Sequence, residues 1–190
     1  MSYIEMYENY VDSLGKALQQ IDRAQMEKFV KILYKACIEG RQIFMFGNGG
    51  SGATASHIAC DLNKGCSYRK RKRFKVVCLN DNIPTMLAYA NDVGYDDIFV
   101  EQLKNFMKPS DVVVGISGSG NSENVIRAID YANKNDAVTV GLCGFSGGRL
   151  KERAKVAVHV EINDMQKVED IHLILGHVAM QILSDERFDV

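Results

Sequence analysis

The sequence predicts a doubly wound α/β fold, and two observations carry this prediction. Five short apolar runs have the length of strands and are nearly continuous, as expected for a parallel sheet covered by helices on both faces. Helical patterns fill the intervals between these runs, and strand–helix alternation favours a layered sandwich with right-handed crossovers. The chain has 190 residues, which is enough for one domain with some additional helix.

The elements follow from the spacing of apolar residues and from stop signals. Before the sheet, residues 1–18 and 22–38 carry apolar side chains at helical spacing, and Gly40 is a good helix stop. Strands are expected at 42–46, 75–79, 111–116, 137–142 and 156–160. Helices are expected at 51–64, 84–106, 121–133, 147–154 and 165–185. The sequence thus predicts a five-stranded sheet preceded by a pair of helices.

Composition narrows the class of protein. Apolar residues make up 46% and charged residues 25%, which is typical of a soluble globular chain and excludes a disordered one. The apolar runs are too short for a membrane span or a secretory signal. The net charge of −1 argues against nucleic acid as the main ligand. Five cysteines without a CxxC motif indicate reduced thiols and a cytoplasmic location.

Two glycine- and serine-rich segments follow the first and third predicted strands, and each opens a helix. They read GNGGSG at 47–52 and SGSGNS at 117–122. Ligands of open parallel sheets bind beyond the carboxyl ends of the strands. The hydroxyls of Ser117, Ser119 and Ser122, with the free N–H groups of a new helix, indicate a cradle for a monophosphate. Neither segment has a Walker motif or a dinucleotide fingerprint. The alternative is that both segments are only tight strand-to-helix turns.

A second set of residues combines histidines with carboxylates. His57 and Asp61 lie four residues apart on one predicted helix and therefore share a face. Glu169, Asp170 and His177 lie on the last helix, where Glu169 and His177 are about 80° apart around the axis. Such a set suits a divalent metal or acid–base chemistry. The alternative is that the carboxylates are solvated and the histidines structural.

Five consecutive basic residues, 69–73, precede the second predicted strand. They could steer an anionic substrate or contact a nucleic-acid partner. A solvated loop on a nearly neutral protein is the favoured interpretation.

These features together resemble the SIS (sugar isomerase) domain family, and most closely its phosphoheptose isomerase branch. The resemblance covers nearly the whole chain. Its segments are the helical pair of the first 40 residues, GNGGS at 47–51, LND at 79–81, ANDVGYDDIFVEQL at 90–103, GISGSGNSENVIRAI at 115–129 and VEDIHLILGH at 168–177.

The resemblance implies a fold, an activity and an assembly. The fold would be a three-layer sandwich with a flavodoxin-like sheet, forming a single SIS domain over 1–190. Residues 1–40 would pack on this domain and on sister subunits of a homotetramer. The activity would be aldose–ketose isomerisation of a phosphorylated sugar, sedoheptulose 7-phosphate to a heptose 7-phosphate, through a cis-enediol and with zinc. The alternatives are a pentose or hexose phosphate substrate, or a non-catalytic relative similar to a replication-initiation factor.

Residue by residue, the resemblance places the phosphate on Ser117, Ser119 and Ser122, with Gly118 where the family usually has threonine. It places Asn48, Gly49 and Ser51 against the sugar, and Asp81 at the sugar hydroxyls. Gln166 falls where the heptose enzymes tend to have aspartate.

The same resemblance assigns His57, Asp61, Glu169 and His177 to the metal and acid–base positions. Asp61 is the expected base, or Glu169 if Asp61 binds the metal, and His177 is the expected acid. Two of these positions depart from the family pattern. The family has glutamate where this chain has Asp61, and glutamine where it has Glu169.

Overall fold

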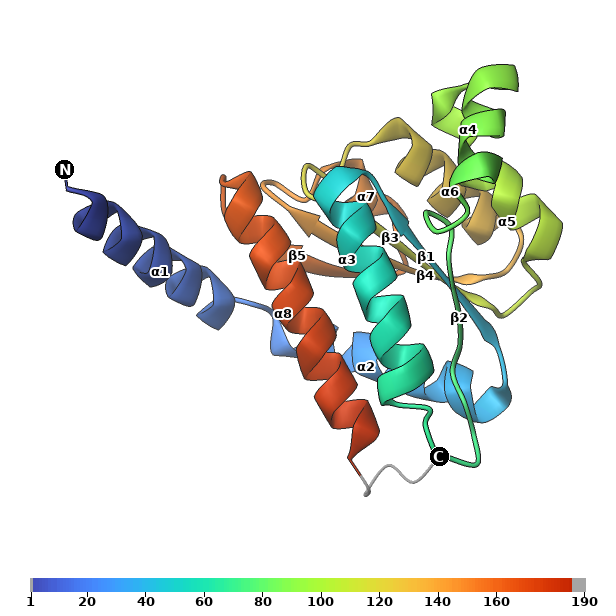
Figure 1. The fold of residues 1–190 in the computed structure, drawn as a ribbon, viewed down its shortest axis with the longest axis horizontal. Coiled ribbons are helices and arrows are strands. Elements are labelled where there is room, and N and C mark those ends of the chain that lie inside the picture. The colour runs from blue at the N-terminus through green and yellow to red at the C-terminus, as the bar shows by residue number, and fades with distance from the viewer. Residues whose placement is uncertain (1, 186–190) are drawn as a thin grey trace.

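The structure is a computed structural model in which residues 2–185 are described. The strands are β1 (Gln42–Gly47), β2 (Lys75–Cys78), β3 (Val112–Ser117), β4 (Val138–Gly144) and β5 (Val156–Val160). The helices are α1 (Tyr3–Gln19), α2 (Arg23–Glu39), α3 (Gly49–Cys60), α4 (Ile83–Asp92), α5 (Val100–Phe106), α6 (Glu123–Lys134), α7 (Gly148–Arg153) and α8 (Met165–Ser184), with a π-helical turn η1 (Asp61–Gly65) and a 3₁₀ turn η2 (Tyr95–Asp97). Figure 1 shows their arrangement.

The five strands form one sheet in the order β2-β1-β3-β4-β5, and every neighbouring pair is parallel. This is the flavodoxin order, in which the direction of winding reverses between β1 and β3. The predicted α/β fold with a parallel five-stranded, flavodoxin-like sheet is confirmed. All five predicted strands are present, and none of their ends differs from the prediction by more than two residues.

Alternate residues of each central strand face opposite helical layers. In β1, Ile43 and Met45 belong to a core that includes buried residues of α2, α3 and α8. Phe44 and Phe46 belong to a second core with residues of α5, α6 and α7. The sheet therefore lies between two helical layers, as the continuous apolar strands predict.

The predicted helix over 84–106 is wrong, because the segment is divided into α4, η2 and α5. Gly94 has φ +140° and ψ 153°, a conformation that residues with a Cβ rarely adopt. The break turns the chain so that Phe99, before α5, stacks on Phe46 of β1 with ring centroids 4.8 Å apart. Packing of an aromatic pair in the core thus overrides the local helical pattern.

The predicted helix over 51–64 is α-helical only as far as Cys60, and it widens into the π-helical turn η1 at Asp61. Asn63 in this turn exchanges two hydrogen bonds with the backbone of Val76 in β2, at 2.8 and 3.0 Å. The contact holds the wider turn against the sheet edge. Single π-turns inside helices occur frequently at functional sites.

One residue of the basic segment 69–73, Lys72, contacts the end of α2. Lys72 donates through its Nζ to the carbonyl oxygen of Ile38, and Lys75 of β2 donates to that of Gly40. Both carbonyls belong to the C-terminal end of α2, where backbone oxygens lack partners within the helix. Lys72 thus caps the end of α2, a role that the favoured interpretation as a solvated loop did not include.

The cysteines behave as apolar residues. All five are free, and only Cys60 is exposed. Burial raises the pKa of the Cys66 thiol to about 11 and the pKa values of Cys78 and Cys143 to about 12. These thiols stay neutral at physiological pH and fill the core. Among the described residues, no helix is long and apolar enough to cross a membrane.

His172 of α8 is fully buried, and within residues 2–185 neither of its ring nitrogens has a hydrogen-bond partner. Burial lowers the pKa of His172 from 6.5 to about 4, because the imidazolium ion loses its hydration. Between these two pH values the unfolded chain binds more protons than the folded chain. Stability must therefore fall as the pH is lowered from 6.5 to 4.

We predict that His172 alone removes about 3 kcal/mol of stability between pH 7 and pH 4. The His172→Leu variant should show a correspondingly shallower loss, measured by urea unfolding of the metal-free protein across this range. Ile171→Val, a change at the neighbouring buried residue of α8 that removes no titratable group, serves as the control and should keep the wild-type slope. An identical pH dependence in wild type and His172→Leu would contradict the prediction.

Candidate active site

Two loops meet at the carboxyl edge of the sheet. One joins β1 to α3 and the other joins β3 to α6, and β1 and β3 are hydrogen-bonded neighbours. Between the loops and the start of α8 lies a pocket of about 250 Å³. Its lining residues are Asn48, Gly49, Gly50, Ser51, Ser117, Gly118, Ser119, Ser122, Met165 and Glu169. Seven of the nine predicted substrate-binding residues are among them.

The other two predicted substrate contacts, Asp81 and Gln166, are not among these lining residues. The Asp81 carboxylate instead accepts a hydrogen bond of 2.7 Å from the Ser56 hydroxyl on α3. Gln166 lies at the exposed start of α8. Their predicted contact with a sugar stays a prediction.

The two helices that open at this pocket lack side-chain caps. Asn48 and Ser122 occupy the N-cap positions of α3 and α6 and belong to the residue types that cap best, yet neither side chain caps its helix. The other helices of ten or more residues in the described chain, α1, α2, α4 and α8, all have side-chain caps. The N–H groups at the start of α3, and those of Glu123 and Asn124 in α6, are therefore left for an anion, whereas the Val125 N–H donates to the Asn124 side chain.

Contacts with the β4–α7 turn and with α7 fix the shape of the loop 117–122, which we call the serine loop. Ser117 and Ser122 lie with their hydroxyl oxygens 3.0 Å apart, at the two ends of the loop. Gly120 has φ +68°, and a Cβ there would lie 2.0 Å from the carbonyl oxygen of Gly147. Only glycine allows this approach, and the Gly120 carbonyl then accepts from the Leu150 N–H at 2.9 Å. The loop is thus held against the β4–α7 turn while its hydroxyls line the pocket.

Met165 is a lining residue that the sequence analysis missed. Its sulfur lies 2.4 Å from the position that a Cβ of residue 118 would occupy. The thioether of Met165 therefore fills the space beside Gly118, and a threonine at residue 118 would require the Met165 side chain to move. The only relevant feature of the sequence is the absence of a side chain at Gly118, which does not predict which residue fills the space.

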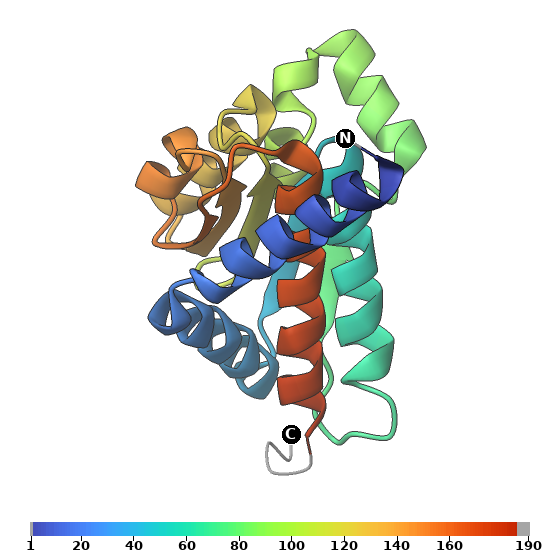
Figure 2. The ribbon, with the colours of Figure 1, turned by 90° about the vertical axis from the view of Figure 1, so that its left-hand side faces the viewer.

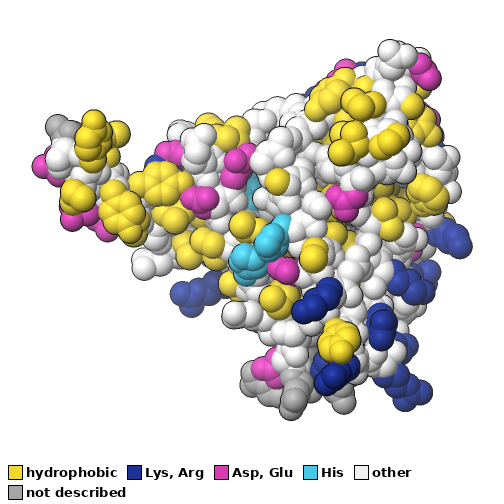
Figure 3. Space-filling view, in the orientation of Figure 1, with side chains coloured by type: hydrophobic (Ala, Val, Ile, Leu, Met, Phe, Trp, Pro, Cys, Tyr) yellow, Lys and Arg dark blue, Asp and Glu magenta, His cyan; other side chains and the backbone are white. Residues whose placement is uncertain are grey.

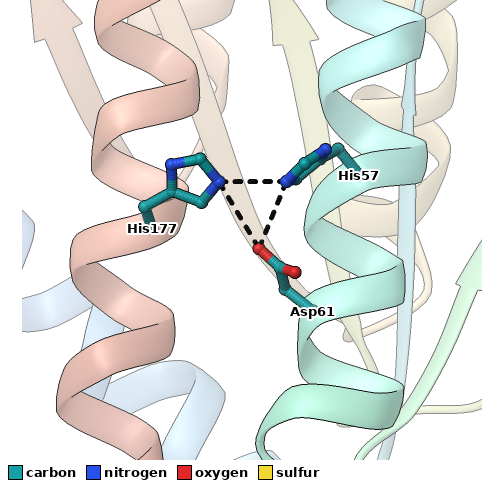
Figure 4. A group of neighbouring side chains, drawn as sticks. All are labelled: His57, Asp61 and His177. Carbon is teal, nitrogen blue, oxygen red and sulfur yellow. Dashed lines mark hydrogen bonds and ion pairs between the residues drawn. The ribbon is translucent and has the colours of Figure 1, made fainter.

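Three potential metal ligands converge between α3 and α8 (Figure 4). The Nε2 atoms of His57 and His177 lie 2.9 Å apart, and Asp61 Oδ2 lies 3.4 Å and 3.7 Å from them. Both imidazole side chains are about half exposed, and Figure 3 shows histidine side chains at the surface beside an acidic one. The predicted facing of His57 and Asp61 across one helical turn is confirmed.

The geometry of these three residues fits a divalent cation. Asp61 Oδ2 is buried and has no hydrogen-bond partner within the described residues. Two ligands of a tetrahedral zinc ion, at 2.0–2.1 Å from it, lie about 3.3 Å apart, and the three measured separations bracket that value. Two imidazoles, one carboxylate and an open fourth position make a donor set that zinc accepts.

Glu169 does not join this group, so the predicted quartet is not assembled within the described part of the chain. The ligand atoms within 4.8 Å of one another belong to His57, Asp61 and His177 alone. Glu169 lies two turns before His177 on α8, about 12 Å along the helix axis. Its carboxylate packs against Gly50, where a Cβ would lie 2.4 Å from Oε1. Glu169 thus belongs to the pocket of the two loops.

Comparison with known proteins identifies the family. Residues 6–144 match the SIS domain. The phosphoheptose isomerase of Thermodesulfovibrio yellowstonii is 33% identical over 189 residues, covering 94% of each chain. The chain belongs to the SIS domain family, in its phosphoheptose isomerase group.

Other members of the group are equally extensive matches to this SIS domain. The probable phosphoheptose isomerase of Thermoplasma acidophilum is 36% identical over 180 residues, which cover 91% of this chain and 98% of the relative. The structure of phosphoheptose isomerase GmhA from Neisseria gonorrhoeae has a TM-score of 0.88 at 26% identity, covering 96% of this chain and 98% of that chain. The resemblance drawn from the motifs is confirmed.

We predict that Gly120→Ala destabilises this SIS domain by about 3 kcal/mol, because the methyl group meets a backbone oxygen in a left-handed conformation. Gly15→Ala is the matched control, since a Cβ at Gly15 in α1 meets nothing within 4 Å. The control should gain up to about 1 kcal/mol. Urea unfolding measures both changes, and equal midpoints for wild type and Gly120→Ala would contradict the prediction.

Proposed function

We propose that the chain is an aldose–ketose isomerase that interconverts sedoheptulose 7-phosphate and a heptose 7-phosphate through a cis-enediol. The observation that carries this proposal is one pocket that contains both an anion-binding serine loop and a carboxylate, Glu169. The names of the relatives, phosphoheptose isomerases over nearly the full chain, support the same reaction.

The serine loop holds the phosphate in this proposal. Ser117, Ser119 and Ser122 offer hydroxyl donors, and the uncapped start of α6 adds N–H groups and the positive end of the helix dipole. The phosphate is remote from the reacting carbons. Its binding energy therefore orients the open-chain sugar rather than changing the chemistry itself.

Glu169 is the base that the geometry supports best. Its carboxylate lies in the pocket, whereas Asp61 lies with His57 and His177 outside it. In the reaction, the Glu169 carboxylate removes the proton from the carbon beside the carbonyl group and returns it to the former carbonyl carbon. The two substrate oxygens exchange one proton in the opposite sense.

Asp61 and His177 then act as metal ligands together with His57. A single Nε2 atom of His177 cannot offer a lone pair to a metal and a proton to the substrate at once. Its convergence with the other two donors favours the ligand role. When bound, zinc would neutralise the Asp61 carboxylate and link α3 to α8 at a site outside the pocket.

The non-catalytic alternative, a sugar-phosphate-binding regulator, is not favoured. A binding protein needs the serine loop alone, but this chain also presents a pocket carboxylate and a separate set of metal-ligating donors. The cytoplasmic location is likewise part of the proposal, supported by five free cysteines.

We predict that Glu169→Gln lowers turnover of sedoheptulose 7-phosphate by at least about a hundredfold while leaving the zinc content unchanged. Asp61→Asn should lower both the zinc content and the turnover, because it removes a ligand. Turnover is measured by product formation with and without added zinc, and zinc by elemental analysis of the purified protein.

Asp170→Asn is the matched control for this prediction, since Asp170 follows Glu169 but hydrogen-bonds Tyr10 of α1 instead of lining the pocket. It should keep turnover within a few-fold of wild type. The double variant Asp61→Glu/Glu169→Gln carries the residues that the family has and should regain activity. Full activity of Glu169→Gln would exclude Glu169 as the base, and saturable binding without turnover by the wild type would favour the regulator.

We also propose that 1–190 is a single SIS domain that assembles as a homotetramer. Helix α8, beyond the matched residues 6–144, packs beside α3 over the sheet, so it completes the same domain. Helix α1 extends away from the sandwich (Figure 1), and Figure 2 shows it crossing α8. Apolar side chains lie exposed on α1 and around α4, among them Tyr7, Val11, Ile83 and Leu87. Such surfaces fit contacts with sister subunits.

Light scattering after size-exclusion chromatography tests this assembly. We expect a mass about four times that of the 21.2 kDa chain. A monomer at micromolar concentration would contradict the proposal.

A further inference from the structure

The polar side chain of Asn48 is held by hydrogen bonds that cross from one loop of the pocket to the other. Asn48 Nδ2 donates to Asn124 Oδ1 at 2.9 Å, and Asn124 Nδ2 donates back to Asn48 Oδ1 at 2.9 Å. Asn124 lies in the first turn of α6 and is buried, with an exposed fraction of 1%. The two amides therefore form a reciprocal pair, which we call the amide pair.

A backbone group decides which way the amide pair is oriented. Asn124 Oδ1 also accepts a hydrogen bond of 2.9 Å from the N–H of Val125. A backbone N–H can only donate, so the atom that it meets must be the oxygen of Asn124. The nitrogen of Asn124 then faces Asn48, and the atom of Asn48 that meets it must be an oxygen.

The oxygen of Asn48 accepts a second hydrogen bond, from Tyr95. The Tyr95 hydroxyl donates to Asn48 Oδ1 at 3.0 Å. An amide oxygen has two lone pairs, and Asn124 and Tyr95 use both. The Asn48 nitrogen has two hydrogens, of which the amide pair uses one. Toward the pocket, Asn48 can therefore offer one N–H donor and no acceptor.

We infer that Asn124 and Tyr95 are positioning residues that fix the Asn48 amide as a hydrogen-bond donor, so that it selects an acceptor oxygen of the sugar phosphate. The inference rests on the proposed function for the identity of its ligand. Asn48 occupies the N-cap of α3 without capping it, because its side chain is turned toward α6 instead. Tyr95 reaches Asn48 because Gly94 breaks the helical segment before it.

The test is a double-mutant cycle on binding. Asn124→Asp keeps an acceptor for the Val125 N–H and removes the donor toward Asn48, so the Asn48 oxygen meets a carboxylate and the amide must turn. The substitution also adds a negative charge in the first turn of α6. We expect the Kd of sedoheptulose 7-phosphate, measured by calorimetry, to rise about tenfold or more. The Kd of inorganic phosphate, bound by the serine loop, reports the effect of this charge alone, so it should rise by a factor at least about five times smaller.

The cycle separates positioning from a general effect on the fold. If Asn124 acts through Asn48, adding Asn124→Asp to Asn48→Ala should weaken binding of the sugar phosphate by no more than it weakens binding of inorganic phosphate. Tyr95→Phe should give a smaller loss of the same kind. Asn135→Asp, the same substitution at the C-cap of α6, is the control and should leave both Kd values unchanged. Wild-type affinity in Asn124→Asp, or fully additive losses, would overturn the inference.

A ligand-free measurement distinguishes failure of this inference from failure of the proposed function. The side-chain NH₂ resonances of Asn48, assigned by their absence in Asn48→Ala, should shift in Asn124→Asp and in Tyr95→Phe but not in Asn135→Asp. If wild type binds inorganic phosphate but not sedoheptulose 7-phosphate, the function is wrong while these shifts still test the amide pair. Unshifted resonances would overturn the inference whatever the substrate.

Discussion

The pairing of β1 with β3 is the constraint on which the rest of this site depends. Gly47, the last residue of β1, lies opposite Ile116, the penultimate residue of β3. Asn48 and Ser117 therefore reach the same edge of the sheet within one residue of each other in register. The Asn80 side chain strengthens this end of β1 by exchanging two hydrogen bonds with the Gly47 backbone, at 2.8 and 3.2 Å. Without this adjacency, the two loops would not share a pocket.

The hydrogen-bonding capacity of the two loops is directed to the pocket rather than to helix stability. A side-chain cap typically contributes about 1 kcal/mol, and both Asn48 and Ser122 forgo that contact. The loss is offset elsewhere, by capped helices such as α2 and α8 and by two cores that cover both faces of the sheet. A rigid α/β framework can thus support helix starts that stay open to an anion.

The parts of this fold that depend on short-range patterns could be predicted from the sequence. The strands follow from unbroken apolar runs, and the loops of the pocket follow from glycine and serine at strand ends, because parallel strands place those ends together. His57 and Asp61 face each other because four residues make about one helical turn. These features require no knowledge of which distant side chains touch.

The missed features all depend on contacts between distant segments. The break at Gly94 is stabilised by Phe99 stacking on Phe46, more than fifty residues earlier in the chain. Tyr95 meets Asn48 only because of that break, and Met165 of α8 fills a space left by Gly118 in the loop after β3. Helical periodicity likewise gives the angle between Glu169 and His177 but does not say which neighbours each will meet across the helix pair.

The positions of Asp61 and Glu169 give a physical reason for the two departures from the family pattern. Asp61 places its oxygen within 3.4–3.7 Å of two imidazole nitrogens, so its shorter side chain suits a ligand held close to α3. A carboxylate confined there, with a buried oxygen, is poorly placed to reach a substrate carbon in the pocket two turns away. Glu169 restores a carboxylate at the pocket, where the family has an uncharged amide. Under the proposed function, the two changes are linked: the base lies on α8 instead of α3, and Asp61 and Glu169 each supply a negative charge to one of the two sites.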